Sequence, residues 1–182
     1  MAPGLLPRFF ERVTQRSFRD LAVDDPPAVG YLADLLTRFA RSEALYVLRD
    51  VPPRRLDSVV GALLTIQRVW DWRSPDFHPE SERALRRQIG DYTLFMTGVF
   101  REHVERLAVA GYYQDEGRRA YRFVSETART GGGAEAPLFR RLSDRFEHYA
   151  GVLSYARKVY MRAEPWAPGE WPGDPFSGFL SA

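Results

Sequence analysis

Cysteine is absent from this chain of 182 residues, and lysine is nearly absent. Without cysteine the protein cannot form disulfides, bind metal through thiolates or use a thiol nucleophile. Lys158 is the only lysine among 26 basic side chains, and the remainder are arginine. Acidic residues alternate with these arginines, as in residues 140–147, and no contiguous basic run is present. Such mixtures are typical of solvated helix faces, so we expect no nucleic-acid partner.

Long apolar runs are also lacking. The nearly continuous apolar stretch over residues 92–100 is far shorter than the ~20 residues of a membrane-spanning helix. The first residues lack the charged segment and apolar core of a secretory signal. A net charge of +2, with 45% hydrophobic and 14% aromatic residues, suits one globular domain with a single core. We therefore expect a cytoplasmic location and no membrane partner.

Hydrophobic periodicity predicts about six helices and no strand. Asp25 precedes Pro26 and Pro27, a pattern that predicts a capped start for the second helix. Short loops between the helices indicate one all-α, bundle-like domain over residues 1–163. The predicted helices cover residues 5–22, 26–48, 55–72, 81–109, 112–129 and 137–162.

The predicted helix over residues 81–109 organises the rest of the chain. Its core stripe consists of Leu85, Ile89, Tyr92, Met96, Val99, His103 and Leu107. Gly90 and Gly98 lie off this stripe, and each costs about 1 kcal/mol relative to alanine in a helix. Close approach by another helix or by a ligand would offset that cost, because glycine has no Cβ. We therefore expect residues 89–100 to be buried on both sides.

Three ionisable residues fall on predicted buried positions. Asp91 lies beside Gly90 in the central helix, Glu43 lies on the apolar face of the second helix, and Arg145 lies within the apolar stripe of the last. One interpretation is a polar, ligand-binding pocket formed by these three residues with Gly90 and Gly98. The other is a structural ion-pair network, since buried charges are nearly always paired.

Familiar catalytic and cofactor motifs are missing. No Glu-x-x-His is present in the sequence. His103 and His148 each directly follow a glutamate, and adjacent residues point in different directions on a helix. The first helix contains no histidine that could ligate haem. Phosphate-loop and serine-hydrolase motifs are absent as well. We therefore expect no metal and no cofactor, assign no catalytic residue, and favour a protein that is not an enzyme.

Residues 164–182 form an irregular tail rich in tryptophan, proline and glycine. Its aromatic residues are too many for a typical disordered tail. Either the tail packs across the bundle, or it docks on a partner through aromatic anchors. The candidate anchors are Trp166, Trp171, Phe176 and Phe179.

Three stretches carry a family resemblance: Tyr31-Leu-Ala-Asp-Leu-Leu-Thr-Arg-Phe-Ala, Ile89-Gly-Asp-Tyr-Thr-Leu-Phe-Met-Thr-Gly, and Gly111-Tyr-Tyr with Gly117-Arg-Arg-Ala-Tyr. Together they resemble an uncharacterised family of bacterial all-helical proteins. The resemblance implies a bacterial, helical, cytoplasmic protein and carries over no functional residue.

The sequence leaves two functions open. The leading hypothesis is a non-enzymatic helical protein that acts through protein–protein interaction or homo-oligomerisation. The alternative is a small-molecule-binding protein or enzyme with a polar pocket around Asp91, Glu43 and Arg145.

Overall fold

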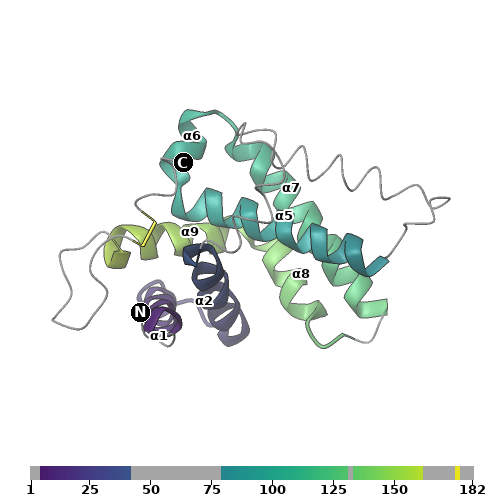
Figure 1. The fold of residues 1–182 in the computed structure, drawn as a ribbon, viewed down its shortest axis with the longest axis horizontal. Coiled ribbons are helices and arrows are strands. Elements are labelled where there is room, and N and C mark those ends of the chain that lie inside the picture. Colours follow the sequence, from purple (N-terminus) through teal and green to yellow (C-terminus); the bar gives the residue numbers. More distant parts are fainter. Residues whose placement is uncertain (1–4, 42–78, 131–132, 162–174, 177–182) are drawn as a thin grey trace.

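The computed structural model describes residues 5–41, 79–130, 133–161 and 175–176. Within these ranges the chain is helical and contains no strand, which confirms the predicted all-α class. The predicted helix over residues 55–72 and the predicted end of the second helix, residues 42–48, lie outside the described residues. The elements are α1 (Leu5–Asp20), α2 (Pro26–Ala40), α5 (Pro79–Val99), α6 (Arg101–Arg106), α7 (Ala110–Thr130), α8 (Ala136–Asp144), α9 (Phe146–Ala156) and the π-helical turn η1 (Arg157–Met161) (Figure 1).

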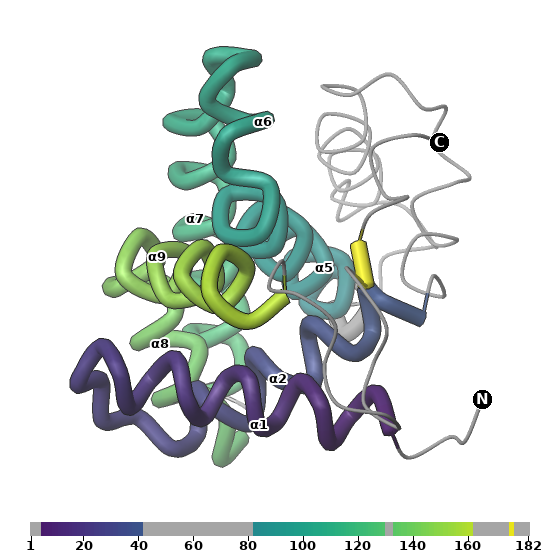
Figure 2. The backbone as a smooth tube through the Cα atoms, turned by 90° about the vertical axis from the view of Figure 1, so that its left-hand side faces the viewer, coloured from purple at the N-terminus to yellow at the C-terminus, as the bar shows by residue number. Residues whose placement is uncertain are grey.

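Helix α5 lies at the centre of the bundle. It packs along α7 and against α9, and α9 lies between α5 and α1 in both views (Figures 1 and 2). Helix α2 packs on α1, and α8 packs on α7. Residues 89–100 are all buried except Tyr92, which is half-buried. The prediction that this stretch is buried on both sides is therefore confirmed.

The glycines of α5 mark the places where neighbouring helices approach most closely. A Cβ at Gly90 would lie 2.6 Å from the ring of Tyr121 on α7. A Cβ at Gly98 would lie 2.5 Å from the Cβ of Leu153 on α9. Of the two alternatives that the sequence left open, helix packing rather than a ligand fills the space beside both residues.

The predicted central helix is interrupted at Phe100. This residue leaves helical angles, with φ at −112° and ψ at 34°, and α6 begins at the next residue. The interruption changes the phase of the apolar stripe, so Val104 is buried while Leu107 is 45% exposed. The placement of Leu107 on the core stripe was wrong for this reason. His103, also placed on that stripe, is half-buried.

The predicted last helix is interrupted in the same way, at Arg145. Its φ of −116° and ψ of 29° separate α8 from α9. Periodicity counted through an unbroken helix placed Arg145 in the apolar stripe, but the break leaves it exposed. The prediction that Arg145 is buried is therefore wrong.

Phe176 belongs to the core of the bundle. Its side chain is 2% exposed, and its ring centre lies 5.1 Å from that of Phe95 and 5.7 Å from that of Phe10. The tail therefore packs on the bundle at this residue, which is not available to dock on a partner. The other candidate anchors, Trp166, Trp171 and Phe179, lie outside the described residues.

None of the helices described here is both long and apolar enough to cross a bilayer.

Candidate functional site

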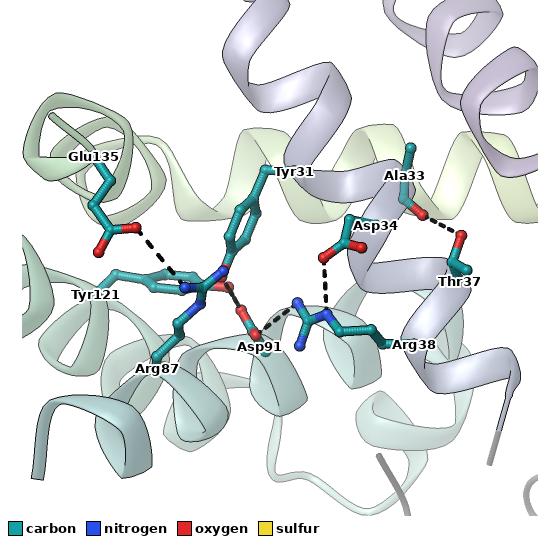
Figure 3. A network of polar contacts seen from close by, with 9 residues as sticks. All are labelled: Tyr31, Ala33, Asp34, Thr37, Arg38, Arg87, Asp91, Tyr121 and Glu135. Carbon is teal, nitrogen blue, oxygen red and sulfur yellow. Dashed lines mark hydrogen bonds and ion pairs between the residues drawn. The ribbon is translucent and has the colours of Figure 1, made fainter. Parts of the chain in front are cut away.

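Asp91 is the centre of a buried hydrogen-bond network (Figure 3). Its side chain is 2% exposed. Its Oδ1 accepts hydrogen bonds from the hydroxyls of Tyr31 on α2 and Tyr121 on α7, the second at 2.9 Å. Its Oδ2 accepts a hydrogen bond from Nη2 of Arg38, also on α2, at 3.0 Å. One carboxylate thus joins three helices, and all three donors are side chains.

Two arginines flank this carboxylate on the side of α2 (Figure 3). Arg38 is 36% exposed and also donates from Nε to Oδ2 of Asp34 at 3.0 Å. Arg87 lies one helical turn before Asp91, with its guanidinium carbon 5.2 Å from the ring centre of Tyr31. Its Nη1 lies 3.8 Å from Oε2 of Glu135. The buried charge of Asp91 is therefore neutralised by Arg38, with a second cation close by.

The two phenols of this network are held in their neutral form. Burial raises the pKa of Tyr31 well above its usual value, the charge of Asp91 raises it further, and Arg87 opposes both effects. Burial and the Asp91 charge likewise raise the pKa of Tyr121 well above its usual value. Although burial opposes the charge on Arg38, the nearby Asp91 carboxylate raises its pKa overall. Both tyrosines therefore act as hydrogen-bond donors at neutral pH.

Among the residues that the structure describes, the suggested pocket does not come together. Glu43 lies outside the described residues, and Arg145 is exposed at the α8–α9 break. Tyr121 and Leu153 fill the space over Gly90 and Gly98. The cation that pairs with Asp91 is Arg38 rather than Arg145.

The partners of Asp91 were not predicted from the sequence. Tyr31 and Arg38 are seven residues apart, two turns of α2, and therefore share a face of that helix. A tyrosine and an arginine on one face of a largely apolar helix are a usable signal for a buried acidic partner. No comparable local signal marks Tyr121 of α7.

Asp25 forms a second buried network at the start of α2. Its Oδ1 accepts a hydrogen bond from the backbone N–H of Ala28 at 3.3 Å, which confirms the predicted cap. Arg141 of α8 donates from Nε to Oδ2 at 2.8 Å and from Nη2 to Oδ1 at 3.2 Å. The hydroxyl of Tyr149 on α9 donates to Oδ2 at 2.6 Å. Although burial acts in the opposite direction, these hydrogen bonds lower the pKa of Asp25.

A small cavity lies where α5 ends and α6 begins. Its volume is about 70 Å³. Residues 98–103 and Arg106 line one side, and Ser154, Arg157 and Lys158 line the other. Sites for drug-sized ligands are several times larger, at roughly 300–1,000 Å³. This cavity can hold only a small group.

Metal ligands do not cluster in the part of the chain that the structure describes: no three His, Asp or Glu residues there are placed to hold an ion. Compared with known proteins, the chain matches no family model, no curated protein and no solved structure. The resemblance to a bacterial helical family therefore stays a prediction.

Proposed function

We propose that this protein acts without catalysis, as a helical scaffold that binds another protein chain, either a second copy of itself or a different protein. The observation that carries the proposal is the closed network around Asp91. The network contains a carboxylate, two phenols and an arginine, which are residue types that an active site would use. Each of these groups instead forms hydrogen bonds that join helices.

A catalytic carboxylate must be able to exchange a proton or contact a substrate. Asp91 instead accepts three hydrogen bonds while 2% exposed. Tyr31 and Tyr121 keep their protons because burial and the Asp91 charge raise the pKa of each. Buried networks that connect helices are more often structural than catalytic. This arrangement supports a brace between α2, α5 and α7.

The aromatic tail is the candidate partner-binding element. Phe176 is seated among Phe10, Phe95 and Phe100 and fixes the tail to the bundle at one point. Large aromatic residues dominate the energetics of many protein interfaces. We assign attachment to Phe176, and partner binding to Trp166, Trp171 and Phe179.

Native mass spectrometry of the full chain purified from its own host tests this function. We expect a symmetric multiple of the chain mass, or a second protein, in the wild-type spectrum. A triple variant, Trp166→Ala with Trp171→Ala and Phe179→Ala, should lose that species and keep its helical circular dichroism. Leu107→Ala is the matched control, because Leu107 is a large apolar residue 45% exposed on the bundle.

Two results would overturn the proposal. One is a wild-type spectrum that contains only the mass of a single chain, whereas a triple variant that forms the same complex as the wild type would overturn only the assignment of partner binding to the tail. The other is a co-purifying small mass that is lost on denaturation, which would favour the small-molecule alternative.

A further inference from the structure

We propose that the cavity at the α5–α6 junction binds a small oxyanion, of the size and charge of phosphate, sulfate or the terminal group of a phosphate monoester. This inference goes beyond the scaffold function and does not depend on it. It rests on the convergence of two irregular helix ends, on the charge of the lining and on the size of the cavity.

Two departures from regular helix meet at this cavity. Phe100 interrupts the helix between α5 and α6, and its φ and ψ are −112° and 34°. On the other side, α9 passes into the π-helical turn η1 at Arg157. Single π-helical turns are rare and occur often at functional sites, because they redirect side chains that a regular helix would place elsewhere. Both irregular ends contribute residues to the lining.

The lining is strongly cationic. Among the residues that the structure describes, it contains three arginines and Lys158, which is the only lysine of the chain, against one carboxylate, that of Glu102. Lys158 Nζ lies 3.8 Å from Oε1 of Glu102, and both side chains are more than half exposed. Arg101 pairs with Glu105, which does not line the cavity. A concave surface on which positive charges outnumber negative ones concentrates anions.

Arg157 provides a fixed cation in this lining. The residue is 5% exposed, and its guanidinium carbon lies 5.8 Å from the ring centres of both Phe100 and Phe176. Packing against two aromatic rings restricts its position before any ligand arrives. A guanidinium matches the oxygens of a phosphate in geometry and charge.

The volume restricts the ligand. A cavity of about 70 Å³ exceeds the roughly 10–15 Å³ that one water needs, and it is far below the size of a nucleotide site. Ser154 adds a hydroxyl that can donate to an oxyanion. The cavity therefore fits one tetrahedral oxyanion, and a larger phosphorylated molecule would have to leave the rest of its structure in solvent.

Calorimetric titration of the full chain with inorganic phosphate tests the site, with sodium chloride at equal ionic strength as the reference. We expect phosphate to bind at millimolar or lower concentration and to raise the melting temperature above that in chloride. Sulfate should compete with it. Lys158→Gln and Arg106→Gln, both at exposed positions, should each weaken binding about tenfold, because each removes a charge-assisted contact.

Arg140→Gln is the matched control, because Arg140 is an exposed arginine on α8 that pairs with Asp144 away from the cavity. It should bind phosphate as the wild type does. Arg157→Gln is informative only if its circular dichroism is unchanged, so the two exposed variants keep the test decisive. Absence of phosphate and sulfate binding, or equal affinities in all variants, would overturn the site.

O-phosphoserine in place of phosphate distinguishes the two sources of the anion. Tighter binding of the monoester would point to a phosphorylated molecule, and tighter binding of inorganic phosphate would point to the unattached ion. These readouts do not involve the oligomeric state, so failure of the oxyanion site leaves the scaffold proposal intact, and the reverse also holds.

Discussion

Asp25 and Asp91 are buried to almost the same degree, at 5% and 2% exposed, but they are held in different ways. Each accepts hydrogen bonds from tyrosine and from one arginine that is 36% exposed, Arg141 in the first case and Arg38 in the second. Asp25 also stands before a helix and accepts a hydrogen bond from its backbone. Asp91 lies inside α5, and the three donors described above are all side chains from other helices.

This difference separates local from tertiary stabilisation. Part of the stabilisation by Asp25 is local, because its carboxylate caps α2 through a hydrogen bond to a backbone N–H within four residues. Such a cap does not depend on how the helix packs against others. The donors of Asp91 lie 60, 53 and 30 positions away along the chain. Its burial is therefore tolerated only when α2, α5 and α7 are all in place. Four experiments test this comparison, from the largest expected effect to the smallest.

Replacement of Asp91 by alanine should have the largest effect. It removes the acceptor of two buried phenols and of Arg38, and breaking a buried ion pair costs about 3–5 kcal/mol in the free energy of unfolding. Urea denaturation followed by circular dichroism measures the change. Asp34→Ala is the control, because Asp34 pairs with the same arginine but is 61% exposed, and its loss should cost less than about 0.5 kcal/mol. Equal effects of the two variants would contradict the bracing role of Asp91.

Asp25→Ala should cost somewhat less, about 2–4 kcal/mol, because it leaves one buried phenol rather than two without an acceptor, although it also removes the helix cap and the ion pair with Arg141. Asp25→Ser should recover about 1 kcal/mol of this, because serine also caps a helix. Asp91→Ser should recover nothing comparable. The same urea denaturation decides the point, and if serine performs equally well at both positions, the distinction between local and tertiary stabilisation is lost.

Gly90→Ala and Gly30→Ala should change stability in opposite directions. A Cβ at Gly90 would meet Tyr121 at 2.6 Å, so the variant should lose about 1–2 kcal/mol through overpacking next to Asp91. Gly30 of α2 has no atom within 4 Å of such a Cβ, so its alanine variant should gain up to about 1 kcal/mol from helix propensity. The midpoints of thermal unfolding of the two variants report the sign. A stabilised Gly90 variant would show that α7 does not pack closely there.

Within the neutral range a change of pH should have the smallest effect of the four, and stability should fall only above pH 10. Burial and the Asp25 hydrogen bond raise the pKa of Tyr149 to about 12 from an ordinary value of 10.0. Because the folded pKa is the higher one, this stabilisation is complete below pH 10 and is lost as the pH rises towards 12. Tyr31 and Tyr121 of the Asp91 network, whose pKa values are raised well above the usual value, should add to the loss in the same direction.

Urea midpoints measured from neutral to alkaline pH test this expectation with Tyr149→Phe. The variant should lose stability less steeply above pH 10 than the wild type, since it lacks one of the titrating groups. Identical alkaline profiles would show that Tyr149 is not coupled to folding.

On the acid side, the lowered pKa of Asp25 gives a stabilisation that is complete above pH 3.8 and is lost as the pH falls through the folded pKa.

Features set within one helix could be predicted from the sequence. The cap at Asp25 and the burial of residues 89–100 were predicted correctly. The breaks at Phe100 and Arg145 were not, because no proline or glycine marks either position and the apolar pattern continues across both.

The sequence by itself determined the helical class, the central place of α5 and the presence of a carboxylate in its buried part. Periodicity, capping residues and glycines are properties of a single helix, so they can be recognised in the sequence. Only the tertiary structure decided that Tyr31, Tyr121 and Arg38 surround Asp91, and that Arg157 and Lys158 meet α6 at one cavity. Which side chains meet depends on how the helices cross, and the crossing depends on contacts between residues tens of positions apart.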